Sequence, residues 1–179
     1  MLILAISTLA FTTISEKKVD VKESKVSWKG YKVTGEHDGT IKLKEGALIF
    51  EGDKLKGGNF TVDMTSITNN DLEGEWKGKL EGHLKSDDFF GVEKHPTAKL
   101  NITEVKSHGN HYTVTGDLTI KNITNPVTFD MTVSENTANA ALKIDRSKFD
   151  VRYGSPSFFN DLKDKAIYDE FDLNVTLKF

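Results

Sequence analysis

The stretch Ile167-Tyr-Asp-Glu-Phe-Asp-Leu-Asn-Val-Thr-Leu-Lys-Phe179 alternates apolar and polar residues almost without error. Successive side chains of a strand point to opposite faces of a sheet, so this pattern predicts a strand with one apolar face and one wet face. The same alternation recurs through most of the chain. A sheet that is apolar on one side throughout must either stack on another layer or curl around its own apolar face. Which of these happens decides whether the protein has a pocket.

Similar alternating runs follow one another from residue 25 onward, separated by turn-forming residues. The expected strands are Lys25–Val33, Thr40–Leu43, Ala47–Glu51, Lys54–Met64 and Thr97–Val105, followed by rows that begin at Tyr112, Val127 and Ala138. We expect turns at Glu45-Gly46, at Ser107–Asn110 and at Asn125-Pro126. Apolar residues at helical spacing predict a short helix between Glu75 and Lys85, and residues 158–165 are expected to form a second short helix or a turn.

About eight strands plus the terminal one, joined by connections too short for helical crossovers, indicate an all-β, antiparallel fold. Such strands close naturally into a lipocalin-like barrel without exposed edges, and a barrel of about eight strands either fills with side chains or holds one small ligand. A two-layer sandwich is the alternative. Small residues on the inward rows favour a cavity over a filled core, and they are Ala98, Gly116, Ala138 and Ala140.

The composition restricts the class of protein. The chain has 179 residues, of which 28% are charged, with 24 basic and 27 acidic side chains. This near-balance gives no basic surface for nucleic acid, and no apolar segment reaches the roughly 20 residues of a membrane-spanning helix. No linker, repeat or low-complexity stretch is present, so residues 17–179 are expected to form one domain.

Residues 1–15 differ in composition from the rest of the chain. They carry no charge and are rich in Leu, Ile and Ala, and Thr13 and Ser15 suit a signal-peptidase cleavage site. Because no Lys or Arg precedes the apolar run, a buried first strand or helix is the alternative. The chain has no cysteine, which excludes disulfides, thiolate metal sites and a lipoprotein anchor. We therefore expect a signal peptide over residues 1–15 and a soluble periplasmic or secreted protein.

Several local patterns, in order along residues 20–179, together resemble the YceI-like family of exported, lipocalin-like proteins that bind polyisoprenoid lipids. The matching stretches are Gly35–Gly39, Gly57–Met64, His83–Phe90, Lys94–Ala98, Gly116–Ile120, Thr124–Phe129, Ile144–Phe149 and Tyr153-Gly154. The resemblance implies an eight-stranded antiparallel barrel with a helical insertion, a long apolar tunnel, and an amphiphilic lipid inside it. The chain departs from the family pattern at Gly91, Asn122 and Ser155–Asp164, which leaves the identity of the lipid open.

Arginine usage is the sharpest chemical signal in the sequence. Arg146 and Arg152 are the two arginines among the 24 basic side chains. If Leu142 and Ile144 face inward, Arg146 shares their parity and lies inside an apolar barrel, where a guanidinium must be paired. Its planar fork suits either a carboxylate of the protein or a phosphate of a ligand. Arg146 is therefore expected either to form a structural ion pair or to contact a lipid head group, and the sequence does not choose between these two roles.

Phenylalanine is abundant, with 11 Phe against four Tyr and two Trp. The candidates for the tunnel wall are Phe60, Phe89, Phe90, Phe129, Phe149 and Phe171. Phe89-Phe90 lies outside the expected strands and could cap an opening, whereas ordinary core packing is the alternative for each phenylalanine. Each buried methylene of an apolar ligand contributes about 0.8 kcal/mol, so several isoprene units would bind tightly without a charged contact.

The five histidines show no metal-binding spacing. His108 and His111 lie in an expected hairpin turn, and no His-Glu-x-x-His motif is present. His83, on the expected helix, could hydrogen-bond a ligand head group. The sequence also has no nucleophile elbow, P-loop or dinucleotide-binding motif. We therefore expect no enzymatic activity, no cofactor and no bound metal.

Together these observations predict a barrel that binds and sequesters, or transports, an isoprenoid-type lipid. The candidate ligand-binding residues are Phe60, His83, Phe89, Phe90, Phe129, Arg146 and Phe149, with Arg146 and His83 at the polar end of the lipid. The alternatives are another long-chain ligand (fatty acid, fatty amide or quinone), a lipid-acting enzyme on the same barrel, and a filled barrel that acts through its surface. The expected partner is thus a long-chain lipid and not nucleic acid. The mature chain is expected to have no integral membrane segment, and a homodimer is an open alternative.

Overall fold

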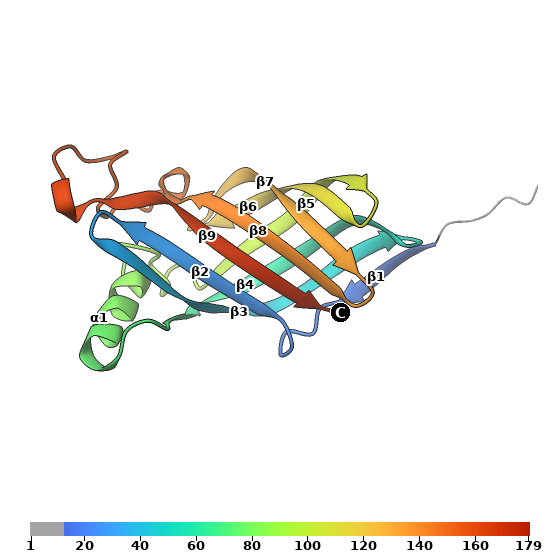
Figure 1. Cartoon of the computed structure of the whole chain (residues 1–179), viewed down its shortest axis with the longest axis horizontal. Coiled ribbons are helices and arrows are strands. Elements are labelled where there is room, and N and C mark those ends of the chain that lie inside the picture. The colour runs from blue at the N-terminus through green and yellow to red at the C-terminus, as the bar shows by residue number, and fades with distance from the viewer. Residues whose placement is uncertain (1–12) are drawn as a thin grey trace, which may run out of the picture.

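The computed structural model describes residues 13–179, which form one closed β-barrel with a helix at one end (Figure 1). The strands are β1 (Ile14–Lys18), β2 (Lys25–Lys32), β3 (Gly35–Glu51), β4 (Lys54–Asn69), β5 (Thr97–His108), β6 (His111–Ile120), β7 (Ile123–Ser134), β8 (Thr137–Asp145) and β9 (Ile167–Lys178). Helix α1 spans Gly74–Lys85, and two 3₁₀ helices, η1 (Arg146–Phe149) and η2 (Lys163–Lys165), lie between β8 and β9.

Eight antiparallel strands close the barrel. The hydrogen-bonded order runs β3-β2-β9-β8-β7-β6-β5-β4, and β4 pairs back onto β3 to complete the ring. The first and last long strands therefore meet, as in the pairs Val26–Val175 and Trp28–Leu173 of β2 and β9. The alternation of Ile167–Phe179 is confirmed as strand β9, and the fold is the expected barrel and not the alternative sandwich.

Strand β1 is an additional strand outside this ring. It pairs with the second half of β3, where β2 no longer covers that edge. Of the expected signal peptide over residues 1–15, residues 1–12 lie outside the part of the chain that the structure describes. Residues 14 and 15 belong to β1.

Two expected turns are wrong. In the first case a bulge bends a continuous strand, and in the second the chain reverses a few residues earlier. Glu45-Gly46 does not end a strand: β3 continues through it, and a register shift between Leu43 and Glu45 bends the strand around the barrel. Asn125-Pro126 lies within β7, and the turn before it is formed by Lys121 and Asn122 with positive φ. Pro126 is tolerated there because β8 pairs only with the later residues of β7, Asp130–Ser134.

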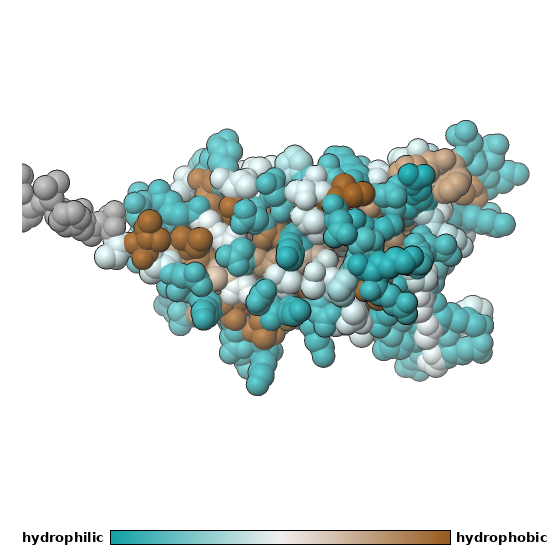
Figure 2. Space-filling model, turned by 180° about the vertical axis from the view of Figure 1, so that it is seen from behind, coloured by the Kyte–Doolittle hydropathy of each residue, from teal (hydrophilic) through white to brown (hydrophobic). Residues whose placement is uncertain are grey.

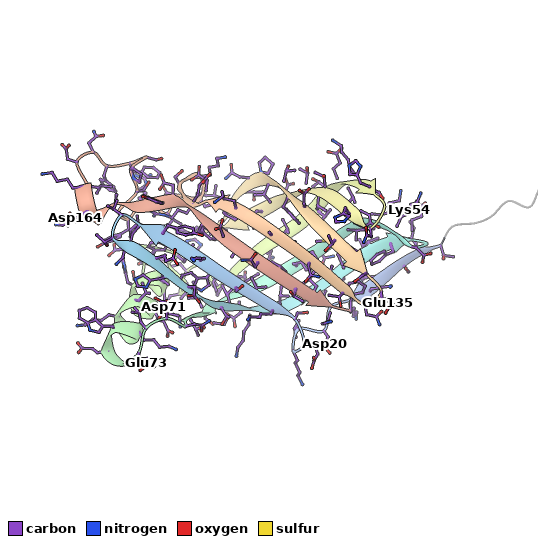
Figure 3. The ribbon with its side chains drawn as sticks, in the orientation of Figure 1. Asp20, Lys54, Asp71, Glu73, Glu135 and Asp164 are labelled. Carbon is purple, nitrogen blue, oxygen red and sulfur yellow. The ribbon has the colours of Figure 1, made fainter. Side chains whose placement is uncertain are left out.

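The two halves of the barrel interior are packed differently. Near β1 and the C-terminus the inward side chains are completely enclosed, with Leu48, Val114 and Ala138 at 0% exposure and Leu55 at 2%. The opposite end carries α1 and the connection between β8 and β9, and Figure 3 labels Asp71, Glu73 and Asp164 there and Lys54 and Glu135 at the filled end. The cavity described next lies in the half near α1.

Candidate functional site: an apolar cavity beneath helix α1

The barrel encloses a cavity of about 140 Å³ in the half near α1. Its wall is built by inward residues of six barrel strands, closed above by the connection after α1 and by η1. The wall comprises Val26, Trp28, Gly30, Tyr31, Ile41, Val62, Met64, Ile67, Leu84, Phe89, Phe90, Ala98, Leu118, Ile120, Arg146, Ile167, Tyr168, Phe171 and Leu173. Among these described residues, Arg146 is the one charged side chain. The cavity therefore suits an apolar ligand.

Trp28 supplies the largest flat surface of this wall, and a glycine on the neighbouring strand positions it. Its indole Nε1 donates a hydrogen bond to the carbonyl oxygen of Thr68 at 3.1 Å. The ring crosses β3 at Gly39, where a Cβ would lie 2.7 Å from the indole and 1.8 Å from the Thr68 oxygen. Only glycine permits this approach. The result is an indole that is 91% buried with its polar atom satisfied.

Phe89 and Phe90 cover the cavity from the segment that follows α1. Their rings meet edge to face, with centroids 5.0 Å apart. The segment is held to the end of α1 by backbone hydrogen bonds, from Phe90 to Leu84 and from Gly91 to Ser86. Gly91 has a φ of +57°, which favours glycine at this turn. The cover is thus an aromatic pair on a short loop and is not part of the barrel wall.

Arg146 reaches the cavity wall from the first residue of η1 and is 2% exposed. Its Nε donates to the carbonyl oxygen of Tyr168 at 3.1 Å, Nη1 to that of Val151 at 2.9 Å, and Nη2 to that of Ile167 at 2.9 Å. Asp169 lies 3.5 Å from Nη2, and the guanidinium stacks 5.2 Å from the centre of the Phe89 ring. Burial lowers the pKa of Arg146 and the Asp169 carboxylate opposes that shift, so the guanidinium remains charged.

A polar network lies beside the cavity on β2, β8 and β9. The Tyr31 hydroxyl donates to Asp172 Oδ2 at 2.5 Å, and Lys143 Nζ lies 3.0 Å from Asp172 Oδ1. The hydrogen bond from Tyr31, followed by that from Lys143, lowers the pKa of Asp172. The same bond raises the pKa of Tyr31. The Tyr31 hydroxyl is therefore held by Asp172, which pairs with Lys29 on the polar face of β2 and β9, and not by a group inside the cavity.

The structure brings some of the expected site residues together and separates others. Phe89, Phe90 and Arg146, and also Phe171, lie in the wall of one cavity. Phe60, Phe129 and Phe149 are buried at 7%, 6% and 1% exposure but lie outside this wall. Their binding roles stay predictions.

His83 also lies outside the cavity wall. Its ring is 4.3 Å from that of Tyr153 and 5.7 Å from that of Phe89, measured between centroids. Its Nε2 is buried and has no hydrogen-bond partner among the described residues. His83 therefore supports the aromatic cover from behind, and a contact between its side chain and a ligand stays a prediction.

Three aromatic residues of the cavity wall were not predicted from the sequence to belong to the site. Trp28 shares the parity of Val26 in the alternating run Lys25–Val33, which gives it no site role, and the close approach at Gly39 depends on the neighbouring strand. Tyr31 and Tyr168 fall on the polar parity of their strands, yet both line the cavity. Both residues lie next to a register irregularity between Gly30 and Lys32, opposite Ile167, which brings their positions close to the cavity. Alternation alone does not reveal such a bulge.

Residues 13–179 show neither a metal site nor a membrane-spanning helix. No group of three or more His, Asp or Glu side chains there is arranged to hold a metal ion. His37 instead pairs with Asp71 at 2.7 Å, and His108 and His111 face each other across an exposed hairpin. Within the same residues, no helix has the length and apolar character needed to cross a membrane.

The sequence was compared with known proteins. It matches the YceI-like domain over residues 18–179. Protein YceI of Escherichia coli O157:H7 is 35% identical over 97 residues, which are 51% of this chain and 46% of that protein. The chain thus spans about half the length of the curated relatives it matches.

Solved structures with the same architecture were also found. BcnA of Burkholderia cenocepacia superimposes with a TM-score of 0.72 at 28% identity, over 89% of this chain and 98% of that one. A polyisoprenoid-binding domain from Saccharophagus degradans superimposes with a TM-score of 0.64 over 92% of this chain and 97% of that one. Its identity of 12% establishes a shared fold alone. The domain match covers all eight strands of the ring, and the chain belongs to the YceI-like family.

Proposed function

We propose that this protein binds an isoprenoid chain in the cavity beneath α1 and keeps it out of water. The observation that carries the proposal is the wall itself: it is apolar throughout except for Arg146, whose guanidinium already donates to three carbonyl oxygens. No buried group in the wall demands a charged partner from the ligand. The polyisoprenoid-binding domain with the same fold supports this choice of ligand class.

The size of the cavity sets how the chain is held. A cavity of ~150 Å³ lined by Leu, Ile and Phe takes up one benzene molecule. The 140 Å³ here therefore encloses about one isoprene unit. A longer chain continues past the mouth or displaces Phe89 and Phe90, which belong to a loop and not to the barrel wall. Each methylene that leaves water contributes about 0.8 kcal/mol.

The polar end of the ligand belongs at the mouth. Tyr168 lines the cavity and is 51% exposed, so this residue lies at the boundary between the cavity and solvent. Such an amphipathic ring suits the junction of an apolar tail and a hydroxyl or amide head group. A free protein of this kind in the periplasm or outside the cell, as the composition of residues 1–15 suggests, would sequester or carry the lipid between membranes.

The test uses the intrinsic fluorescence of the cavity. The chain has two Trp, of which Trp28 lines the cavity and Trp76 is 69% exposed, so Trp76→Phe makes the cavity indole the sole reporter. Geraniol and farnesol are titrated into this variant, with glycerol as a polar control. We expect a saturable change in Trp28 emission with both prenols, tighter for farnesol, and none with glycerol.

Two further measurements complete the test. Organic extraction of protein purified from its native host, followed by mass spectrometry, should release an isoprenoid. No saturable response to either prenol, together with an extract free of lipid, would overturn the proposal. The alternative ligand is a fatty acid, whose carboxylate would compete with Asp169 for the N–H groups of Arg146 that do not donate to carbonyl oxygens. Tighter binding of laurate than of farnesol would select it.

A further inference from the structure

Exposed apolar side chains, most of them aromatic, gather at the end of the barrel that contains the cavity. We call Val33, Tyr153, Phe158, Phe159 and Tyr168 the rim patch, with exposures of 51%, 48%, 39%, 49% and 51%. In Figure 2 the brown of apolar residues appears at the tip of the molecule that carries the connection between β8 and β9. Soluble proteins rarely leave several large apolar side chains exposed side by side without a use for them.

Backbone hydrogen bonds hold the rim patch in place. The Val33 amide donates to the carbonyl oxygen of Ala166 at 3.1 Å, and the Ile167 amide to that of Gly154 at 2.8 Å. These bonds join the β2–β3 turn, the start of β9 and the segment around Tyr153. Phe158 and Phe159 both donate through their amides to the carbonyl oxygen of Ser155. The aromatic rings are therefore presented on an ordered turn next to the mouth.

The connection that carries Tyr153, Phe158 and Phe159 of the rim patch has charges of both signs in equal number. The segment from Asp150 to Lys165 carries Arg152, Lys163 and Lys165 against Asp150, Asp161 and Asp164. Arg152 lies over the Phe158 ring at 4.9 Å and pairs with Asp150 at 2.5 Å. A surface of aromatic rings between charges of both signs complements the interfacial zone of a bilayer of zwitterionic phospholipids, where Trp, Tyr and Phe accumulate.

We propose that the rim patch docks the mouth of the barrel onto the surface of a zwitterionic phospholipid bilayer. The area favours a bilayer over a second copy of the chain: five side chains about half exposed present roughly 500 Å². A stable protein–protein interface buries about 800 Å² on each partner. Tyr168 belongs both to the rim patch and to the cavity wall, so docking sets the cavity mouth against the membrane. This inference rests on the proposed function in one respect, namely that the lipid bound in the cavity comes from a membrane.

The experiment is flotation of the purified protein with phosphatidylcholine vesicles that contain no isoprenoid. Phe158→Ser with Phe159→Ser should lower the vesicle-bound fraction about tenfold or more, because two exposed rings no longer leave water. Phe158→Trp with Phe159→Trp should raise it, because indole is favoured at the bilayer interface. Val21→Ser removes an exposed apolar side chain from the β1–β2 turn, outside the rim patch, and should leave flotation unchanged.

The outcomes separate the docking surface from the cavity. Phe158 and Phe159 are absent from the cavity wall, so both double variants should bind farnesol in solution as the unchanged protein does. Docking is overturned if the unchanged protein does not float, or if the serine variant floats equally well. It is also overturned by a combination of three results. Sedimentation shows that the unchanged protein dimerises, the serine variant does not dimerise, and the tryptophan variant binds vesicles no more strongly than the unchanged protein. Flotation without farnesol binding would instead overturn the cavity function and leave docking in place.

Discussion

Arg146 joins three segments of the chain from a single buried position. Its three hydrogen bonds end on carbonyl oxygens of Val151, Ile167 and Tyr168, which belong to the segment after η1 and to the start of β9. The planar fork of a guanidinium suits this arrangement because its N–H groups diverge in one plane. The same side chain thus closes the barrel mouth structurally and contributes the one charge of the cavity wall.

We expect Arg146→Met to destabilise the protein by about 3–5 kcal/mol, because it leaves three carbonyl oxygens without their donor and the Asp169 carboxylate without its counter-charge. Arg152→Met is the matched control. Arg152 is exposed and should change the free energy of unfolding by less than about 0.5 kcal/mol. Urea denaturation measures both. Equal midpoints for the two variants would contradict the structural role of Arg146.

Gly39 is required by the indole that crosses it. We expect Gly39→Ala to destabilise the protein by at least about 1–3 kcal/mol, because the new methyl overlaps the Thr68 carbonyl and the Trp28 ring. Gly57→Ala is the control, since its Cβ would meet nothing closer than 3.8 Å. The emission of Trp28 should change in the first variant and stay constant in the second. An unchanged emission spectrum in Gly39→Ala would be inconsistent with the packing.

The Tyr31–Asp172 hydrogen bond makes part of the stability depend on pH. Because the folded state lowers the pKa of Asp172, this carboxylate stabilises the fold above the ordinary Asp pKa of about 3.9, and that stabilisation is lost as the pH falls through the lowered value. We expect Tyr31→Phe to move the pKa of Asp172 upward and to reduce this loss. Urea denaturation at several pH values from about 5 downward should show a shallower slope in Tyr31→Phe. Identical slopes would refute the contribution.

At the scale of elements, the strands were accessible from the sequence where one face is apolar and one is wet. β9, β6 and the part of β4 from Phe60 to Met64 obey this rule, and each was expected near its observed position, whereas Thr65–Asn69 of β4 was not expected as strand. The bulges were not accessible, because a register shift such as that between Leu43 and Glu45 depends on the neighbouring strand and not on local residues. The site followed the same division: Phe89, Phe90 and Arg146 were chosen by local chemistry, whereas Tyr168 lies in the cavity wall next to a bulge.

Helix α1 is weakly anchored compared with the strands it covers. Leu84 is its one buried residue, and Gly78 and Gly82 lie in its interior, where a Cβ would meet nothing within 4 Å. We expect Gly78→Ala to raise the free energy of unfolding by about 0.5–1 kcal/mol, because alanine loses less backbone freedom on forming a helix. Gly74→Ala, at a φ of +55°, should instead lower it. Thermal denaturation of both variants measures these effects. A lower melting temperature in Gly78→Ala would contradict the observation that the helix surface at Gly78 has room for a methyl group.

At the scale of the molecule, one barrel contains a filled half and a hollow half. Small inward residues were expected to leave a cavity, and only one of them, Ala98, lines it. Ala138 is completely buried in the filled half, and the backbone at Gly116 is approached by Leu100, whose Cδ1 would lie 3.0 Å from an added Cβ. A small residue therefore creates space only where its neighbours do not close over it, and those neighbours come from other strands. This is why the sequence indicated a hollow without locating it.

The same substitution placed in each half tests this division. Ala98→Leu extends into the cavity, so we expect it to weaken farnesol binding by about tenfold or more while changing the free energy of unfolding by less than about 1 kcal/mol. Ala138→Leu forces extra methylenes into a region at 0% exposure and should destabilise by about 1–3 kcal/mol. Urea denaturation and the Trp28 titration measure the two effects separately. If both variants are destabilised equally, the interior beneath α1 is as tightly packed as the other half and no isoprene unit fits there. If Ala98→Leu binds farnesol as tightly as the unchanged protein, the ligand lies elsewhere on the molecule.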